Sequence, residues 1–328
     1  MKAIEFSQFG RPAEMAVMVE RPDPAPPGPG EVLVETLVAT INPADLLTIE
    51  GRYGVRPALP AIPGAEAVGR IAALGDGVTE LAVGDIVLIM TGATWRDRAV
   101  LKAAAVMRLP ADIDVEQAAM IKANPATALA MITGIVPLAD GEWLIQNAAN
   151  SAAGRFVVQL ARRRGIRTVN IVRRDGPVDE LRALGADVVL VDDGTDPARL
   201  AAAVAAATGN APIRLALDAV GGTATDGLAA SLGEGGVIAN YGLLSGAACQ
   251  VDPYHLVFRG IRLQGFWLAQ WARAQGAAMR AHFAGLIDLV ATGEIRAEVE
   301  ARYPFARIAE ALDHAARPGR SGKILLTP

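Results

Sequence analysis

Cysteine and histidine are scarce in this chain of 328 residues, which contains one cysteine, Cys249. A single thiol excludes a disulfide within the chain and any metal site built on several cysteines. The three histidines, His255, His282 and His314, are widely spaced, and no H-E-x-x-H motif is present. We therefore expect the histidines to be surface or packing residues, and we expect no bound metal.

A strong charge imbalance and long hydrophobic runs are also lacking. The formal net charge is −4, so no basic field points to nucleic acid or to an anionic membrane. No window approaches the roughly 18 apolar residues of a membrane span. The start, MKAIEFSQFG, lacks the apolar core of a signal peptide. These absences favour a soluble cytoplasmic protein.

The first third of the chain has the pattern of strands. Hydrophobic residues make up 52% of the chain, and its length suggests about two domains. Strands are expected at Glu31–Ile41, in EAVGRIAAL and in GDIVLIM, and the run RPDPAPPGPGE predicts a stiff surface connector. The segment VEQAAMIKANPATALAMIT has a helical pattern, which we expect to be interrupted at Asn124, with Asn124 as N-cap and Pro125 at the first helical position.

From Glu142 the pattern changes to a regular alternation of strands and helices. Strands such as EWLIQNA, RTVNIV, DVVLV and IRLALDAV alternate with helical segments such as SAAGRFVVQLARRR. This alternation predicts a parallel sheet with crossover helices. The tail, from about 275 to 328, is expected to contain two helical segments and a final strand, KILLTP, and to fold back onto the first domain.

The turn between EWLIQNA and the following helix is a candidate pyrophosphate site. A helix N-terminus offers free N–H groups and the positive end of the helix dipole to an anion. The usual G-x-G-x-x-G is missing, but small residues fill Ala148–Ala153, and Gly154 can preserve a close contact between helix and strand. An ordinary turn with a small packing face would have the same composition, so the motif alone is weak evidence, and the run of six small residues within a full β-α-β unit strengthens it.

Two arginines occupy the position that normally distinguishes NAD from NADP. This position lies about 20 residues beyond the last glycine of the dinucleotide fingerprint. Here it carries Arg173 and Arg174 rather than an acid. Their forked donors suit a ribose 2′-phosphate, so the position favours NADP(H) over NAD(H). The alternative is that both are solvated loop arginines, which we consider less favoured because the β-α-β unit fixes their position. The run Arg162–Arg164 lies at the end of a helix, where positive side chains interact favourably with the helix dipole. We therefore predict no binding site there.

Several stretches together resemble a known family over nearly the whole chain. They are INPADLLTIEGRYG, LPAIPGAEAVGRI, ATWRDRAV, KANPATALAMI, IQNAANSAAG, NIVRR, LALDAVGG, RGIRLQGFWLAQW and SGKILL. The sequence resembles the zinc-free branch of the medium-chain dehydrogenase/reductase superfamily, and within it the mitochondrial-type trans-2-enoyl-thioester reductases. Zinc-dependent relatives carry a cysteine at Asn42 and a histidine at Ala65, so the resemblance also implies that no zinc is bound.

The resemblance implies a fold and two domains. The fold class is α/β, with a GroES-like β-rich catalytic domain and a doubly wound Rossmann domain. The catalytic domain is expected to span 1–113 and 275–328, and the NADPH-binding domain 114–274. The family is commonly a dimer through the edge of the cofactor sheet, so a homodimer is expected.

The resemblance also implies a set of site residues. The tyrosine of G-x-Y-G, Tyr53, is the expected catalytic residue, with Asn42 and Trp267 at the substrate cleft. The expected cofactor contacts are Asn124, the turn residues Asn150, Ser151, Ala152 and Ala153, the clamp Arg173 and Arg174, the loop Tyr241, Gly242, Leu243 and Leu244, the loop Phe266, Trp267, Leu268 and Ala269, and Lys323. The family often has R-D-R after the second strand, whereas this chain has R-R-D, so the dominant arginine is left open.

Some of these residues also have purely structural interpretations. Asn124 can be an N-cap as well as a cofactor contact. Trp267 and Trp271 are spaced as on one helix face, where an aromatic pair usually packs in a core. A tyrosine between glycines in an irregular segment has little packing reason to be there, which favours a catalytic Tyr53 over a loop aromatic.

The implied reaction is NADPH-dependent reduction of the C=C bond of a trans-2-enoyl thioester, carried by CoA or by an acyl carrier protein. The phenolic O–H of Tyr53 could donate a hydrogen bond to the developing enolate oxygen. An NADPH:quinone reductase or another activated-alkene reductase is the alternative. A non-catalytic NADPH-binding protein is a further alternative, against which a retained Tyr53 argues.

Overall fold

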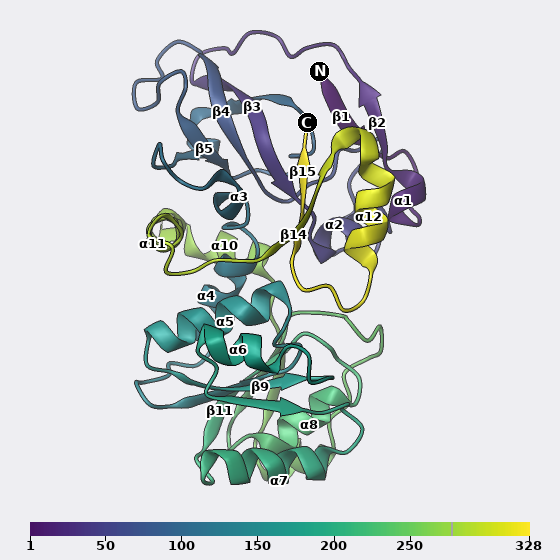
Figure 1. Cartoon of the computed structure of the whole chain (residues 1–328), viewed down its shortest axis with the longest axis vertical. Coiled ribbons are helices and arrows are strands. Elements are labelled where there is room, and N and C mark those ends of the chain that lie inside the picture. Colours follow the sequence, from purple (N-terminus) through teal and green to yellow (C-terminus); the bar gives the residue numbers. More distant parts are fainter. Residues whose placement is uncertain (277) are drawn as a thin grey trace. The chain divides into compact units, whose positions relative to one another are not determined.

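The computed structural model describes residues 1–276 and 278–328, and these divide into two compact units. Unit 1 comprises Met1–Ala123 and Phe283–Pro328, and unit 2 comprises Asn124–His282. Among the described residues, unit 1 contains two sheets and unit 2 contains one (Figure 1). The predicted limits of the functional domains, at 113/114 and 274/275, remain a prediction.

Unit 1 is built mainly from strands. Its described residues form a two-stranded antiparallel sheet, β1-β2, and a seven-stranded sheet with the order β14-β15-β3-β4-β5-β7, in which β6 also pairs with β3. The strands are β1 (Lys2–Glu5), β2 (Val17–Glu20), β3 (Glu31–Thr40), β4 (Ala67–Leu74), β5 (Ile86–Ile89), β6 (Arg98–Lys102), β7 (Val106–Arg108), β14 (Val299–Pro304) and β15 (Lys323–Thr327).

Short helices connect and cover these strands. They are α1 (Pro12–Met15), α2 (Pro43–Ile49), η1 (Ala103–Ala105), α3 (Val115–Ala118), η2 (Phe305–Arg307) and α12 (Ile308–Ala316). Helix α11 (Ala278–Ala291) contains the boundary between the two units.

Strand β3 explains how polar residues enter the core of unit 1. Its first residues alternate between partly exposed and buried, as expected for a strand with one face on the core. Burial becomes continuous from Val38 to Thr40, because β3 there pairs with β4 and, at its carboxyl end, with β15 (Figure 1). Thr40 and Asn42 are therefore delivered to the interior, close to the fully buried Trp95.

Unit 2 is a parallel sheet with helices on both faces. Its described strands have the order β10-β9-β8-β11-β12-β13, and every neighbouring pair is parallel. In chain order this is 3-2-1-4-5-6, the arrangement of a doubly wound dinucleotide-binding fold. The strands are β8 (Trp143–Gln146), β9 (Arg167–Val172), β10 (Val188–Val191), β11 (Ile213–Asp218), β12 (Val237–Asn240) and β13 (Arg262–Gly265).

The crossover helices cover the two faces of this sheet. Figure 1 shows α5 and α6 on one face and α7 and α8 on the other. The helices of unit 2 are α4 (Asn124–Gly134), α5 (Ala152–Arg163), α6 (Val178–Leu184), α7 (Pro197–Thr208), α8 (Ala224–Ser231), α9 (Pro253–Phe258) and α10 (Leu268–Gln275). The predicted fold class, a GroES-like first part with a Rossmann sheet, is confirmed.

Three local predictions need correction. Helix α4 begins at Asn124 itself, so the predicted N-cap is the first helical residue. Leu268 and Ala269 open α10 instead of lying in a loop. Of the predicted tail, Phe283–Pro328 belongs to unit 1, and it contains the additional strand β14, which pairs in parallel with β15.

Candidate active site

A cluster of buried polar side chains lies at the carboxyl end of β3. Thr40, Asn42, Asp45, Glu66 and Lys323 are each at most 4% exposed. We call these five residues the Glu66 cluster. Buried polar groups are costly unless they are hydrogen-bonded, so the contacts within this cluster fix its geometry.

One carboxylate oxygen of Glu66 collects two donors. Glu66 Oε1 accepts from Thr40 Oγ1 at 2.7 Å and from Asn42 Nδ2 at 2.8 Å. Asn42 Nδ2 also donates to Thr40 Oγ1 at 2.9 Å. The Asn42 amide is therefore held in one orientation by two side chains.

Lysine and aspartate contacts complete the environment of Asn42. Lys323 Nζ donates to Asn42 Oδ1 at 2.6 Å and to the carbonyl of Ile41 at 3.1 Å. The backbone N–H of Asn42 donates to Asp45 Oδ2 at 2.8 Å, at the start of α2. Burial raises the pKa of Asp45 to about 7 and lowers the pKa of Lys323.

Tyr53 lies in the irregular segment that follows α2. Its N–H donates to the carbonyl of Leu47 at 3.0 Å, which turns the chain back over the end of the helix. Gly51, at φ +72°, permits this turn, and a Cβ there would lie 2.9 Å from the Phe9 ring. The Arg56 guanidinium lies 4.5 Å from the centre of the same ring. The predicted catalytic tyrosine is thus carried by a packed loop.

In unit 2, the predicted pyrophosphate turn joins β8 to α5. Ser151 is the N-cap of α5, and its Oγ accepts from the N–H of Gly154 at 3.1 Å. A Cβ on Gly154 would lie 2.6 Å from the carbonyl oxygen of Ala149, so only glycine allows this close approach. Ala148 has φ +47°, an unusual conformation for alanine that is often found at functional turns.

The buried side chain of Arg155 holds the turn in place. Arg155 is 6% exposed, and its Nε donates to the carbonyl of Asn150 at 3.0 Å. Its guanidinium also donates to Glu180 Oε2 of α6 at 2.8 Å. This ion pair fixes the Asn150 peptide relative to the neighbouring helix.

Asp218 joins the carboxyl ends of three neighbouring strands. It is fully buried, and its Oδ1 accepts from Asn147 Nδ2 at 2.6 Å, after β8. Its Oδ2 accepts from Thr225 Oγ1 at 2.8 Å and from Asn240 Nδ2 at 3.1 Å, at the end of β12. Ligands of open parallel sheets bind at this carboxyl edge. Asp218 therefore fixes the loops that would surround a ligand.

Tyr241 places an unsatisfied hydroxyl beside the turn. The hydroxyl is buried next to Ser151 but has no well-formed hydrogen bond within the described residues. Burial raises the pKa of Tyr241, so it remains protonated at neutral pH. The loop continues through Gly242, where a Cβ would lie 2.5 Å from the Ala219 carbonyl oxygen, to the exposed Leu243 and Leu244.

The remaining predicted residues occupy the ends of secondary-structure elements. Arg173 and Arg174 are exposed and directly follow β9. Trp267 follows Phe266 as the N-cap of α10, and the Arg273 guanidinium lies 5.6 Å from the centre of its ring. Trp271 instead packs on His282, with ring centres 5.1 Å apart, which agrees with its interpretation as a packing residue.

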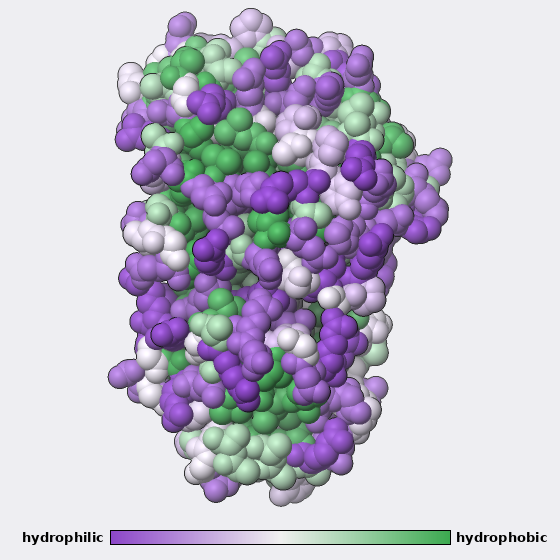
Figure 2. Space-filling model, in the orientation of Figure 1, coloured by the Kyte–Doolittle hydropathy of each residue, from purple (hydrophilic) through white to green (hydrophobic). Residues whose placement is uncertain are grey.

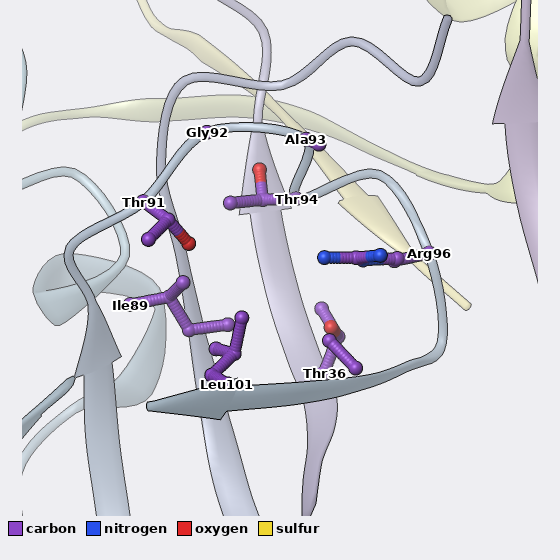
Figure 3. A pocket seen from close by; sticks show the side chains of 9 residues that line it. Thr36, Ile89, Thr91, Gly92, Ala93, Thr94, Arg96 and Leu101 are labelled. Carbon is purple, nitrogen blue, oxygen red and sulfur yellow. The ribbon is translucent and has the colours of Figure 1, made fainter. Parts of the chain in front are cut away.

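A small pocket of unit 1 is not the candidate site. Its lining residues include Thr36, Thr94 and Arg96, with the Arg96 guanidinium directed inward (Figure 3). It measures about 170 Å³ including open solvent, below the roughly 300 Å³ at which ligand pockets begin. Thr94 Oγ1 donates to the carbonyl of Glu66 at 3.2 Å, so the lining of this pocket helps to hold the Glu66 backbone in place.

Sequence reasoning missed Glu66, Lys122 and Asp218. A signal was present for two of them. Glu66 is a lone acid in the apolar stretch GAEAVG, and Asp218 ends the buried strand IRLALD. An acid in such a position must find partners, and at a carboxyl sheet edge those partners surround the ligand site. Lys122 had no comparable signal.

Within residues 1–276 and 278–328, no group of three or more His, Cys, Asp or Glu residues is arranged to hold a metal ion. None of the described helices is long and apolar enough to cross a membrane.

Comparisons with known proteins identify the family. The model for the alcohol dehydrogenase GroES-like domain matches residues 28–135, and the model described as zinc-binding dehydrogenase matches residues 152–290. The human protein named mitochondrial enoyl-[acyl-carrier-protein] reductase is 33% identical over 334 residues, covering 100% of this chain and 88% of the relative. The chain therefore belongs to the medium-chain dehydrogenase/reductase superfamily of oxidoreductases.

Two solved structures have nearly the same fold. A putative NADPH:quinone reductase from Bacillus thuringiensis is 32% identical, with a TM-score of 0.90 and coverage of 100% of this chain and 98% of that chain. The complex of Etr1p with NADP and crotonyl-CoA is 26% identical, with a TM-score of 0.90 and coverage of 100% and 99%.

Proposed function

We propose that this protein reduces the C=C bond of trans-2-enoyl thioesters with NADPH. The observation that carries the proposal is the 33% identity, over the full length of this chain, to a relative named enoyl-[acyl-carrier-protein] reductase. A solved structure of the same fold contains NADP and crotonyl-CoA. The physical features of both units agree with this reaction.

The turn at α5 suits the pyrophosphate of a dinucleotide. Ala152 and Ala153 stand at the start of α5, where backbone N–H groups lack helical partners. The buried Tyr241 hydroxyl is an additional donor beside Ser151. Asn150, Asn124, Lys323 and the loops Tyr241–Leu244 and Phe266–Ala269 would complete the contacts.

Arg173 and Arg174 would bind the ribose 2′-phosphate. Both side chains are exposed at the carboxyl end of β9, where a phosphate can approach them from solvent. A planar guanidinium fork offers two parallel N–H donors to phosphate oxygens. This chemistry favours NADPH over NADH.

The chain's own groups would stabilise the charge that develops on the substrate. NADPH, when bound, supplies the hydride that adds to the β-carbon of the enoyl group. Tyr53 would donate a hydrogen bond to the thioester oxygen as it becomes an enolate oxygen. Asn42, held by Thr40, Glu66 and Lys323, would line the substrate site with a fixed amide, and Trp267 would border it.

A quinone is the alternative acceptor. The relevant observation is the 32% identity to a structure described as a putative NADPH:quinone reductase. The same cofactor groups would serve both reactions, but a quinone has no thioester carbonyl. The acceptor therefore distinguishes the two functions.

Further properties belong to this proposal. The thioester carrier would be CoA or an acyl carrier protein. The protein would be a homodimer through α9 and the edge strand β13, where Tyr254, Val257 and Phe258 are 56%, 69% and 74% exposed. Cytoplasmic localisation is likewise a proposal, whereas the name of the human relative includes "mitochondrial".

The test is a substrate panel combined with one substitution. Wild type and Tyr53→Phe are assayed with NADPH against crotonyl-CoA and a simple quinone. Loss of one oxyanion donor costs roughly 2.7–4 kcal/mol, so crotonyl-CoA turnover should fall about 10²–10³-fold. Quinone reduction should fall much less, because a quinone is more electrophilic and needs less stabilisation.

Binding of NADPH is the control for this experiment, since the Tyr53 hydroxyl is proposed to contact only substrate. Its dissociation constant should be nearly equal in wild type and Tyr53→Phe. Near-normal crotonyl-CoA reduction by the variant would remove Tyr53 from the mechanism. A wild type that reduces only the quinone would establish the alternative function.

A further inference from the structure

The two oxygens of the Glu66 carboxylate serve two different parts of unit 1. Oε1 holds the side chains of Thr40 and Asn42, as described above. Oε2 accepts from the backbone N–H of Ala123 at 2.7 Å. Glu66 is fully buried, so neither oxygen can exchange these donors for water without local rearrangement.

Ala123 is the last residue of unit 1 before the chain enters unit 2. The residue before it is anchored as well. Lys122 Nζ donates to the carbonyl of Ala65 at 2.6 Å and to the carbonyl of Thr91 at 2.7 Å. Burial lowers the pKa of Lys122 to about 8, while Glu66 and Asp45 oppose this shift. The last two residues of unit 1 before α4 are thus held by the partly exposed Lys122 ammonium group and by the buried Glu66 carboxylate.

Asn124, the next residue, opens α4 and is a proposed cofactor contact. A covalent and hydrogen-bonded path therefore runs from Asn124 through the Ala123 N–H and Glu66 to Asn42, a proposed substrate contact. A cofactor that fixes Asn124 would also fix the Ala123 peptide, and with it the orientation of the Glu66 carboxylate.

We propose that Glu66 is a positioning residue that makes substrate binding at Asn42 depend on cofactor binding at Asn124. The inference rests on the proposed function, because both asparagine roles belong to it. Energetic coupling is reciprocal, so the substrate would tighten cofactor binding by the same factor. Glutamate is required because both of its oxygens accept.

Glutamine cannot replace both functions of this carboxylate. Its single oxygen can serve either the Ala123 N–H or the Thr40 and Asn42 donors, and its NH₂ group would face the remaining donor. Glutamine has nearly the same shape as glutamate, so Glu66→Gln interrupts the hydrogen-bonded path from Asn124 to Asn42 while changing the packing little. Charge-assisted hydrogen bonds are also stronger than their neutral counterparts.

The experiment measures crotonyl-CoA binding by calorimetry with and without saturating NADP⁺, a pair that cannot react. For the wild type, NADP⁺ should tighten crotonyl-CoA binding about fivefold or more, the lower end of typical allosteric coupling. In Glu66→Gln this factor should fall to about twofold or less. The affinity for NADP⁺ alone should be nearly unchanged.

Asp45→Asn is the matched control. Asp45 belongs to the same buried cluster and accepts from the Asn42 N–H, and the substitution is equally isosteric. Its carboxylate accepts from the Asn42 N–H and not from the Ala123 N–H, and it acts on Lys122 through its charge. The coupling factor should therefore survive in Asp45→Asn, even if crotonyl-CoA affinity changes.

Thr40→Val is the second variant, for use if Glu66→Gln does not fold. It removes the hydroxyl that bridges Asn42 and Glu66 without changing side-chain shape. Its coupling factor should lie between those of the wild type and Glu66→Gln.

The possible outcomes separate this inference from the proposed function. A wild type without coupling, a Glu66→Gln variant with normal coupling, or an Asp45→Asn variant that loses coupling equally would each overturn the role of Glu66. None of these outcomes affects NADPH-dependent reduction. A wild type that fails to bind crotonyl-CoA at all would contradict the proposed function itself and the inference with it.

Discussion

At the scale of single residues, Asp45 makes the stability of the protein depend on pH. Burial is the largest cause that raises its pKa to about 7, and the charge of Glu66 adds to the effect. The N–H of Asn42 and the charge of Lys323 oppose the shift. The unfolded chain would keep Asp45 ionised down to its ordinary pKa of 3.8.

The folded state therefore binds more protons than the unfolded state between pH 3.8 and about 7. The contribution of Asp45 to stability falls as pH rises through this window and is constant above it. Asp45→Asn carries no charge, so its stability relative to wild type should increase with pH, by on the order of 3 kcal/mol. Urea unfolding of both proteins at about pH 4.5, 5.5, 6.5 and 7.5 measures the difference in their free energies of unfolding. A difference that stays constant with pH would contradict the buried, weakly acidic Asp45.

At the scale of elements, the β8–α5–β9 unit carries the cofactor prediction. Replacing Arg173 and Arg174 with alanine should cost about 1.5–3 kcal/mol of NADPH binding, or one to two decades in affinity. NADH has no 2′-phosphate and should bind almost as before. The matched control replaces Arg162 and Arg163, which are exposed in the last turn of α5, and removes the same charge. Fluorescence titration measures both cofactors, and equal weakening of NADPH and NADH would refute the clamp.

The elements themselves were largely predictable because their patterns are local. The alternation after Glu142 predicted the parallel sheet, and the burial of β3 follows its alternating sequence. Strand β14 was missed although VEARYP alternates, because none of its residues is fully buried and its pairing with β15 depends on a partner distant in sequence. The start of α4 differs by one residue, within the usual uncertainty of helix ends.

The candidate site was predictable only in part. The turn at Ala148–Gly154 and the arginines after β9 have fixed positions within one local unit. The Glu66 cluster instead contains residues far apart in the sequence, such as Asn42 and Lys323, whose side chains are hydrogen-bonded across 281 positions. No spacing rule within one segment can reveal such contacts, because the pairing of β3 with β15 creates them.

At the scale of the whole molecule, the exposed apolar side chains of α9 lead to a prediction about assembly. On the face that Figure 2 draws, hydrophobic areas lie on both units with hydrophilic residues between them. On the short helix α9, Tyr254, Val257 and Phe258 lie within five consecutive residues, and each is more than half exposed. Strand β13, at the end of the six-stranded sheet, also pairs on one side with β12. An apolar helix beside an open strand edge is a typical protein interface or an aggregation hazard.

A second copy of the chain would cover both features at once, since a twofold axis brings the same surface together from each subunit. Light scattering of the wild type should then give about twice the mass of one chain, 34.1 kDa. Val257→Glu places a charge in this surface and should shift the protein toward the monomer. Val83→Glu is the matched control, because Val83 is 63% exposed in unit 1, close to the 69% of Val257. A monomeric wild type, or a Val257→Glu variant that remains dimeric, would show that α9 and β13 do not form the interface, whereas dissociation by Val83→Glu would place it in unit 1.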